Sequence, residues 1–218
     1  KMPDSYYEDD HVVIYHGDCL ELLPDLVFDV VVTDPPYGLE WKQPPMKKSP
    51  KGYEGIRNDK DTYFRDELLT KISKDMPVVM FGSPLIQIPA NTKQVLVWQK
   101  PPDSGLFGCV AGFRRDWEAI YLLGKWPQKG PKRSSIIKTK EGLSSYLKGE
   151  AHPHTKPQNL MKQILQTMPE GVILDPFMGS GSTLRAAKDL GRKAIGIEIE
   201  EKYCEIAANR MGQEVLPI

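Results

Sequence analysis

The sequence predicts an α/β protein with a single doubly wound, mostly parallel sheet. Residues 28–33 and 172–174 are apolar and largely β-branched, as is typical of parallel strands that are covered on both faces. Residues 172–197 also read as strand, glycine turn, helix and strand, which is the repeating unit of such a fold. The chain has 218 residues, is 40% hydrophobic and shows no internal repeat. We therefore expect one domain over residues 1–218.

The first half of the chain predicts three strands and two helices. They are strand 12–16, a short helix around 20–23, strand 28–33, a helix near 63–74 and strand 77–81. Strand 28–33 must end at Asp34, because the two prolines that follow have no N–H group to continue the sheet. Leu68 and Ile72 lie four residues apart and give the helix near 63–74 an apolar stripe.

The second half predicts four strands and three helices. They are strands 95–98, 119–123, 172–174 and 194–197 and helices 157–168, 184–188 and 201–211. Pro157 stands near the start of its helix, where a missing N–H group costs little. Gly191 follows helix 184–188, as is common at a helix C-terminus. Strands 95–98 and 119–123 are expected to pair at the sheet edge.

The tetrapeptide Asp34-Pro35-Pro36-Tyr37 lies at the carboxyl end of a predicted central strand, where open α/β sheets bind their ligands. The Asp34 carboxylate and the Pro35 carbonyl can together accept both hydrogens of an amino group. Tyr37 can stack on the heterocycle that carries this amine. The tetrapeptide therefore fits a receptor for the exocyclic amine of a nucleobase. The alternative is an ordinary turn that ends a strand.

The glycine turn after strand 172–174 fits a nucleoside site. Gly179 and Gly181 let the backbone approach a ligand, and Glu198 follows about 20 residues later, where an acid accepts from ribose hydroxyls. A dinucleotide fingerprint needs a third glycine where Leu184 stands, and a P-loop needs a lysine where Gly181 stands. Asp175 would also repel a phosphate. The pattern therefore indicates a nucleoside cofactor without phosphates.

These segments together resemble the β class of DNA amino-methyltransferases, which use S-adenosylmethionine. In that class the DPPY-type motif precedes the FxGxG motif, a circularly permuted order, as 34–37 precedes 177–181 here. Residues 16–19 (HGDC) resemble the segment that contacts the cofactor adenine, and residues 152–157 (HPHTKP) resemble an HPTxKP-type element with a departure at His154. The resemblance implies a Rossmann-like methyltransferase fold with an antiparallel hairpin at the sheet edge.

The resemblance also implies the roles of individual residues. The catalytic residues are Asp34, Pro35, Pro36 and Tyr37. The residues that bind S-adenosylmethionine are Asp18, Cys19, Asp34, Thr155, Lys156, Asp175, Phe177, Gly179, Gly181, Ser182 and Glu198. Among them, Asp18 is expected to accept from the adenine amine, and Thr155 and Lys156 are candidates for the methionine carboxylate. Phe177 is expected beside the adenine or ribose, although an ordinary core position would suit it equally.

The implied reaction is methyl transfer to the N6 amine of adenine in double-stranded DNA, on a base flipped out of the helix. Asp at the first position of the tetrapeptide is usual in adenine-N6 enzymes, whereas Ser is more typical of cytosine-N4 enzymes. The alternatives are an N4-cytosine methyltransferase, an RNA or protein methyltransferase, and a nucleic-acid-binding module without activity. Intact residues 34–37 argue against the last of these. A role in restriction-modification follows from the family.

The charge distribution suggests where DNA binds. The net charge is zero, with 29 basic and 29 acidic side chains. Basic residues concentrate in segments 38–60 and 124–150, which we expect to be loops that contact DNA or set target recognition. The alternative is that both segments are solvated surface loops.

The remaining expectations concern compartment and metals. Cys19, Cys109 and Cys204 lack CxxC spacing, which favours reduced thiols in a cytoplasmic protein of a bacterial, archaeal or phage-infected cell. His152 and His154 form an HxH pair without further ligands nearby, so no metal is expected. The sequence shows no apolar run long enough for a membrane. The expected partners are double-stranded DNA and S-adenosylmethionine, and the expected state is a monomer or homodimer.

Overall fold

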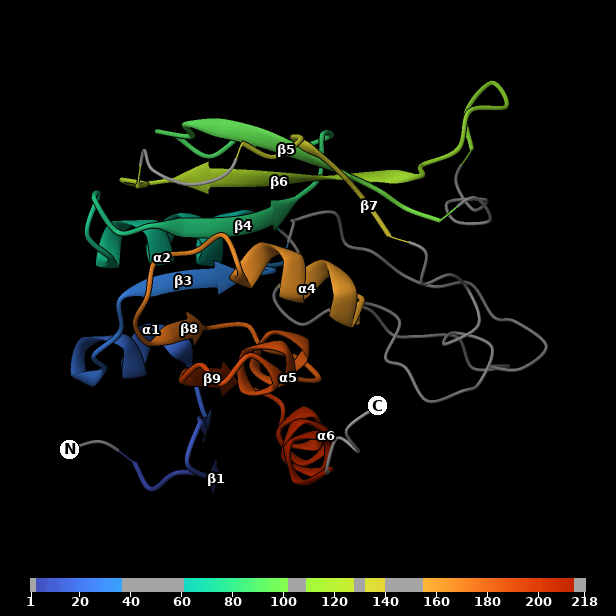
Figure 1. The fold of residues 1–218 in the computed structure, drawn as a ribbon. Coiled ribbons are helices and arrows are strands. Elements are labelled where there is room, and N and C mark those ends of the chain that lie inside the picture. The colour runs from blue at the N-terminus through green and yellow to red at the C-terminus, as the bar shows by residue number, and fades with distance from the viewer. Residues whose placement is uncertain (1–2, 37–60, 102–108, 128–131, 140–154, 214–218) are drawn as a thin grey trace.

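A nine-stranded sheet with helices on both faces forms the fold (Figure 1). The computed structural model describes residues 3–36, 61–101, 109–127, 132–139 and 155–213. The strands are β1 (Tyr7–Glu8), β2 (Val12–His16), β3 (Val30–Thr33), β4 (Val78–Gly82), β5 (Gln94–Gln99), β6 (Trp117–Leu123), β7 (Ile136–Lys138), β8 (Ile173–Asp175) and β9 (Ala194–Glu198). Their order across the sheet is β1-β2-β9-β8-β3-β4-β6-β5-β7. The predicted fold class is confirmed.

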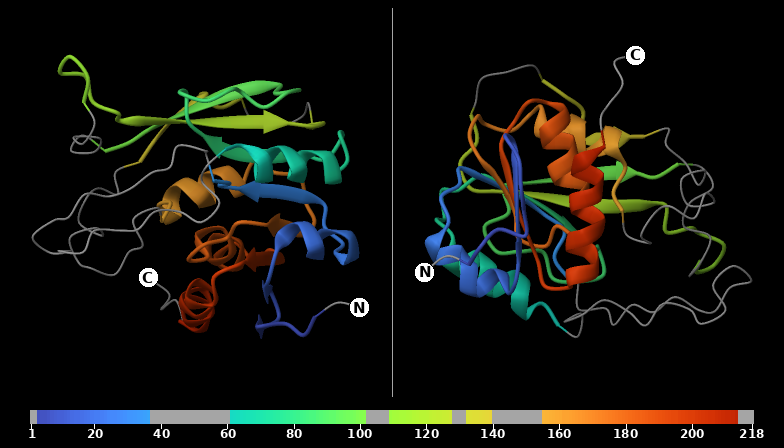
Figure 2. Two further views of the ribbon diagram at one scale, coloured as in Figure 1. Left: turned by 180° about the vertical axis from the view of Figure 1, so that it is seen from behind. Right: turned by 90° about the horizontal axis from the view of Figure 1, so that it is seen from below.

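Helices cover the sheet in two layers, which makes the fold doubly wound. The α-helices are α1 (Cys19–Leu22), α2 (Tyr63–Lys71), α4 (Gln158–Leu165), α5 (Ser182–Asp189) and α6 (Glu201–Gly212), and a 3₁₀ turn spans Leu23–Asp25. The right-hand view of Figure 2 shows α1 and α2 on one face and α4, α5 and α6 on the other. Helices α2 and α4 end earlier than predicted, at Lys71 and Leu165.

The central strand β3 shows why its residues are apolar throughout. Val30 and Val32 belong to the core on the α4–α6 side, whereas Val31 belongs to the core on the α1–α2 side. All three side chains have no exposed surface. Successive side chains of a strand point to opposite faces of the sheet. Because both faces are covered here, all three of these positions are apolar instead of every second one.

Two strands were not predicted. β1 pairs antiparallel with β2 over only two residues, and the Oδ1 of Asp9 stabilises the turn between them by accepting from the N–H groups of His11 and Val12, each at 2.8 Å. β7 pairs parallel with β5 at the other edge and lies inside the segment 124–150. The prediction of a loop is therefore wrong at Ile136–Lys138.

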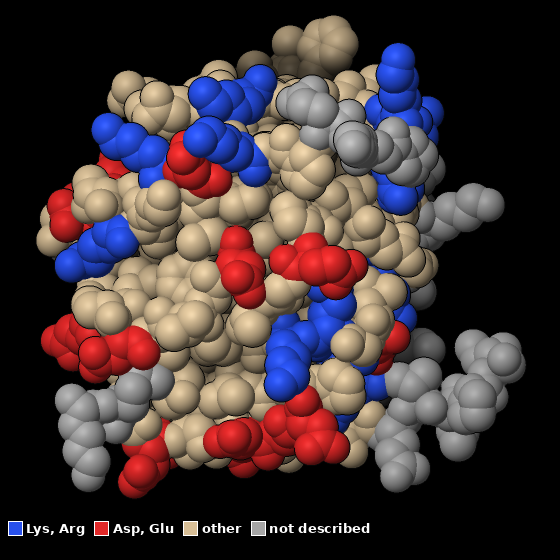
Figure 3. All heavy atoms as spheres, turned by 60° about the vertical axis from the view of Figure 1, so that its left-hand side comes forward, with Lys and Arg blue, Asp and Glu red and all other residues tan. Residues whose placement is uncertain are grey.

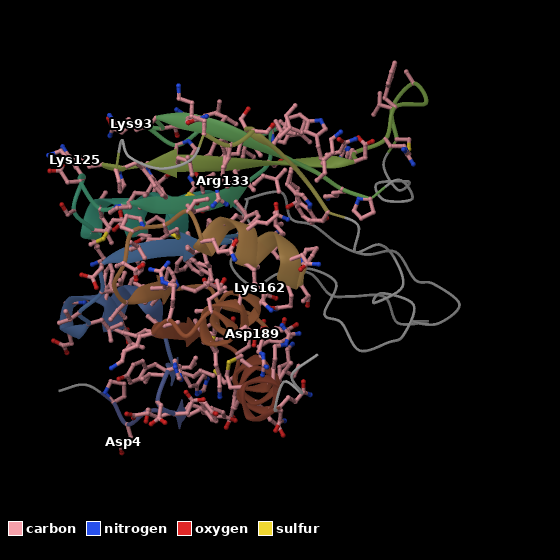
Figure 4. The ribbon with its side chains drawn as sticks, viewed as in Figure 1. Asp4, Lys93, Lys125, Arg133, Lys162 and Asp189 are labelled. Carbon is pink, nitrogen blue, oxygen red and sulfur yellow. The ribbon has the colours of Figure 1, made fainter. Side chains whose placement is uncertain are left out.

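β7 also divides the basic residues of segment 124–150. It runs in the same direction as β3, so the residues before it lie at the amino edge of the central strands and Lys138 lies at the carboxyl edge. Lys125 at the amino edge forms an ion pair with Asp75 at 2.7 Å, and Arg133 also precedes β7 (Figure 4). On the side from which β3 and β4 begin, acidic and basic side chains are interspersed (Figure 3). Segment 38–60 lies outside the described residues.

The strand order reverses between β3 and β8, and this reversal creates the crevice for the site. β3 and β8 are parallel neighbours, but β3 leads through α2 to β4 on one side, whereas β8 leads through α5 to β9 on the other. The crossover segments therefore diverge at the carboxyl ends of the two strands, which is where ligands bind in such sheets. Asp34 directly follows β3, and Asp175 is the last residue of β8.

Gly181 fixes the packing of α5 against α6. It caps the N-terminus of α5 in a left-handed conformation, with φ of +76°. A Cβ atom at this position would lie 2.9 Å from the Cβ of Ala207 in α6, closer than side chains normally approach. Both the backbone angle and the space therefore require glycine.

We expect Gly181→Ala to lower the free energy of unfolding by more than Gly191→Ala. Gly191 also has a left-handed φ, of +67°, but a Cβ atom there would meet nothing within 4 Å, so its substitution costs only the backbone strain of about 1–2 kcal/mol. Gly181→Ala adds the steric cost of overpacking, about 1–3 kcal/mol. Urea denaturation of both variants measures the difference. Equal losses would contradict the contact with α6.

Candidate active site

A pocket opens at the carboxyl edge of β3 and β8 and collects nearly all the predicted site residues. Those that line it are Asp18, Cys19, Asp34, Pro35, Pro36, Thr155, Lys156, Asp175, Phe177, Gly179, Ser182 and Glu198. Tyr37 lies outside the described residues. Gly181 is absent from the lining, because its α-carbon faces α6. The sequence predicted that Gly181 lets the backbone approach the cofactor. In the structure, glycine is required there by the close packing against Ala207 of α6.

The ammonium group of Lys156 lies between two carboxylates in the pocket wall. Its Nζ is 2.8 Å from the Oδ2 of Asp34 and 3.0 Å from the Oε2 of Glu118. Lys100 completes the chain of charges, with its Nζ 2.6 Å from the Oε1 of Glu118. The Nζ of Lys156 also lies 4.8 Å from the centre of the Phe81 ring, within range of a cation–π interaction.

Within this network, Lys156 and Glu118 both stay charged despite their burial. Burial alone would lower the pKa of Lys156, but the carboxylates of Asp34 and Glu118 raise it above its usual value. Burial alone would raise the pKa of Glu118, but Lys156 and Lys100 hold it at about 2. Glu118 was not predicted as a site residue. A charged residue inside the buried strand pattern of β6 was the available signal.

Asp175 has a different electrostatic environment, although it lies at the same edge. Burial raises the pKa of Asp175 to about 7, and the carboxylates of Asp34 and Glu198 also act to raise it. Hydrogen bonds from Thr183 and from the backbone N–H of Phe177, the latter at 3.2 Å, oppose this shift. The pocket therefore contains one carboxyl group that titrates near neutral pH.

Glu198 ties the glycine turn to the end of β9. Its Oε2 accepts from the N–H of Gly179 at 3.0 Å, and its Oε1 accepts from the N–H of Glu200 at 2.9 Å. Gly179 is left-handed, with φ of +50°, and a Cβ atom there would meet nothing within 4 Å. The hydrogen bond to Glu198 thus fixes the turn. Because Gly179 has no side chain, its backbone is accessible from the pocket.

Asp18 and Cys19, at the start of α1, also line the pocket. Asp18 caps α1, because its Oδ1 accepts from the N–H of Leu20 at 2.9 Å. Burial raises the pKa of the Cys19 thiol to about 12, so the side chain stays protonated and contributes no nucleophile.

Three hydroxyl groups add polar contacts to the pocket. The Oγ1 of Thr155 and the Oγ of Ser180 lie 3.1 Å apart and share a hydrogen bond across the pocket wall. Thr33, the last residue of β3, is 1% exposed, and its Oγ1 has no hydrogen-bond partner in the described part of the chain. A buried hydroxyl without a partner carries a cost that a bound ligand would relieve.

The described residues provide neither a metal site nor a membrane span. They contain no group of three or more His, Cys, Asp and Glu side chains that could hold a metal ion, and His152 and His154 lie outside them. Within the same residues, none of the helices is both long and apolar enough to cross a membrane.

Comparisons with known proteins identify the class. A family model described as DNA methylase, N6_N4_Mtase, matches residues 65–209, which is most of the chain. The type II methyltransferase M.ScaI of Streptomyces caespitosus is 27% identical over 267 residues, covering 96% of this chain and 84% of its own. The chain therefore belongs to the DNA methylase family, whose methyl donor is S-adenosylmethionine.

Solved structures agree with the fold. The crystal structure of an M1.HpyAVI–SAM complex matches with a TM-score of 0.64 and 25% identity, covering 93% of this chain and all of the other. The PvuII DNA methyltransferase, described as cytosine-N4-specific, matches with a TM-score of 0.68 and 19% identity, covering 98% of this chain and 90% of the other. The latter likeness shows the fold alone.

We expect Asp175→Asn to stabilise the protein without ligand at high pH but not at low pH. The raised pKa means that the folded state binds the Asp175 proton more tightly than the unfolded state does between pH 4 and pH 7. The cost of the buried charge is therefore fully present above pH 7 and disappears as the pH falls toward 4. Asn removes that cost, with a gain on the order of 1 kcal/mol or more at pH 8. Urea denaturation at pH 5 and pH 8 measures it, and a gain of equal size at both values would contradict the assignment.

Proposed function

We propose that this protein transfers the methyl group of S-adenosylmethionine to the N6 amine of adenine in double-stranded DNA, acting on a flipped-out base. The observation that carries the proposal is the pairing of Asp34 with Lys156 beside the glycine turn, in one pocket at the strand-order reversal. This arrangement puts a hydrogen-bond acceptor for an amine next to a site for a nucleoside.

The pocket fits S-adenosylmethionine by its chemistry. Gly179 offers backbone with open space, Phe177 and Asp18 offer a wall for the adenine, and Glu198 offers carboxylate oxygens for the ribose hydroxyls. Asp175 offers a carboxyl group for the ammonium, and a cation there favours its ionised form. When bound, the cofactor supplies a methyl group already activated by its sulfonium.

We propose for Lys156 a role other than the one implied by the resemblance. It was a candidate for the methionine carboxylate, but its ammonium is engaged by Asp34 and Glu118. Of the predicted pair, Thr155 remains the candidate for the carboxylate, with Ser180 beside it at 3.1 Å. We assign Lys156 to positioning Asp34 instead.

Asp34 would act by orientation and electrostatics. The lone pair of the adenine amine is delocalised into the ring, which makes the nitrogen a poor nucleophile. Hydrogen bonds from the amine to the Asp34 carboxylate and the Pro35 carbonyl localise the lone pair and direct it. The negative charge of Asp34 also stabilises a nitrogen that becomes positive. The ammonium of Lys156, 2.8 Å from the Oδ2 of Asp34, holds the carboxylate in place for this contact.

The ion-pair network limits which group takes the proton that leaves the methylated nitrogen. Lys156 has no free site for a proton, because its pKa is raised. Glu118 has a pKa of about 2 and is too weak a base. Among the carboxylates and amines of this network, Asp34 remains as a proton acceptor, and solvent water is the alternative.

The choice of adenine rests on Asp34, since Asp at this position is the form usual in adenine-N6 enzymes. N4-methylation of cytosine is the second candidate, because that amine presents the same two hydrogens to Asp34 and Pro35. The comparison family includes enzymes of both kinds.

Analysis of the methylated product tests the proposal. We expect labelled S-adenosylmethionine and mixed-sequence duplex DNA to yield N6-methyladenine after digestion to nucleosides and mass spectrometry. Asp34→Ala should lose this product by several orders of magnitude, yet retain cofactor affinity by calorimetry, because Asp175 and Glu198 remain. N4-methylcytosine would overturn the base, and no labelled nucleoside from the wild type would overturn the activity. Substantial methylation by Asp34→Ala would overturn the role of Asp34.

The kinetics of methylation test the positioning role of Lys156. In Lys156→Met, Asp34 and Glu118 lose the cation that lies 2.8 and 3.0 Å from them, so the Asp34 carboxylate is no longer held in place. We expect kcat to fall about a hundredfold, as for a misplaced catalytic group, while the affinity for S-adenosylmethionine changes little. Lys156→Arg, which keeps the cation, should restore most of kcat. An equal loss of kcat and of cofactor affinity in Lys156→Met, without rescue by Lys156→Arg, would indicate a purely structural role.

A further inference from the structure

A tight turn, here called the hairpin tip, precedes β6 beyond the carboxyl edge of the sheet, at Val110–Phe113. Val110 and Phe113 each donate a backbone hydrogen bond to the other's carbonyl, at 3.2 and 2.9 Å. The two central residues, Ala111 and Gly112, are left-handed, with φ of +51° and +82°. This is the two-residue turn that suits the twist of a hairpin. Figure 1 shows it projecting beyond the sheet at the upper right.

The tip exposes apolar side chains in an unusual place. Phe113 is 79% exposed and Val110 is 69% exposed, although both could have been polar at a solvent-facing turn. A Cβ atom at Gly112 would meet nothing within 4 Å, as expected of a turn that points into solvent. The two exposed apolar side chains share one projecting turn, where a partner molecule can bury both of them.

The hairpin is close to the pocket along the chain. Glu118 lines the pocket, and Phe113 lies five residues before it. Five extended residues span at most roughly 18 Å. That distance equals about five phosphate spacings along one DNA strand. A duplex that delivers a base to the pocket therefore passes within reach of the tip.

The charges beside the tip match DNA. Arg114 and Arg115 directly follow Phe113, and both are exposed. Arg114 also has an ion pair with Asp116 at 3.7 Å, which holds its side chain near the hairpin stem. Arginines bind phosphates, while an adjacent aromatic ring can stack on a base or wedge between two of them.

We propose that the hairpin tip is a DNA-binding element, in which Phe113 packs against bases near the flipped nucleotide and Arg114 and Arg115 bind the flanking phosphates. The inference rests on the proposed function and adds a contact that the pocket does not supply. The alternative occupant of the hairpin tip is a second copy of this chain. Val110 and Phe113 alone provide far less than the roughly 800 Å² per partner that a stable protein interface buries.

Affinity for duplex DNA tests the role of Phe113. We expect Phe113→Ala to weaken binding about tenfold, in line with the loss of one stacked ring, and Phe113→Tyr to restore most of it. Cofactor affinity should not change, because the tip lies outside the pocket lining. Val27→Ala is the matched control, since Val27 is 84% exposed but precedes β3 and so lies at the opposite edge. Fluorescence anisotropy with labelled duplex gives the DNA affinity, and calorimetry gives the cofactor affinity.

Cys109 provides a second measurement that does not depend on the stability of a variant. It precedes the tip and is exposed, whereas Cys19 and Cys204 are buried. A duplex with a disulfide-tethered phosphate within about five positions of the target base should crosslink to Cys109, and one tethered more than about ten positions away should not.

The outcomes separate the two proposals. Unchanged DNA affinity of Phe113→Ala, or no crosslink from the near tether, would overturn the hairpin inference while methylation by the wild type upheld the proposed function. A change from dimer to monomer in Phe113→Ala, with unchanged DNA affinity, would assign the tip to self-association instead. A wild type that neither binds nor methylates DNA would overturn both.

Discussion

The charge of Lys156 links four parts of the chain at the carboxyl edge of the sheet. Asp34 follows β3, Glu118 belongs to β6, Lys100 follows β5, and Lys156 precedes α4. The pairing of the strands brings the first three to this edge, and the Lys156 side chain, which is 11% exposed, lies between Asp34 and Glu118. Because an unpaired buried charge costs several kcal/mol, Lys156 cannot lose these partners without a large loss of stability. The ammonium therefore fixes where the Asp34 carboxylate points.

The two aspartates at the strand-order reversal have different neighbours. Asp34 has a lysine at 2.8 Å, whereas Asp175 has burial and two nearby carboxylates, which raise its pKa to about 7. A carboxyl group that titrates near neutrality responds to a cation, so the binding of a cationic ligand can offset the destabilisation that buried Asp175 brings to the pocket.

Much of the sheet could be predicted because its signals are local. β2 has the predicted bounds, and β3 ends where the prolines require. β7 could not be predicted, since three residues among lysines form a strand only because β5 offers an edge. The partners of Lys156 and the contact of Gly181 with Ala207 depend on how distant elements pack. Sequence patterns could therefore single out Lys156 and Gly181, but they could not predict which side chains contact them.

The order of the motifs along the chain matters little to the geometry of the pocket. Asp34 comes from the first fifth of the sequence and Asp175 from the last, yet β3 and β8 pair as parallel neighbours and bring both to one edge. Any parallel strand delivers its final residue to the same side of the sheet. What the pocket needs is that these two strands be adjacent and that their crossovers diverge. Because β6 runs antiparallel to β4, it brings its first residues to that same edge, and so it supplies Glu118 to the pocket wall and begins the hairpin beyond it.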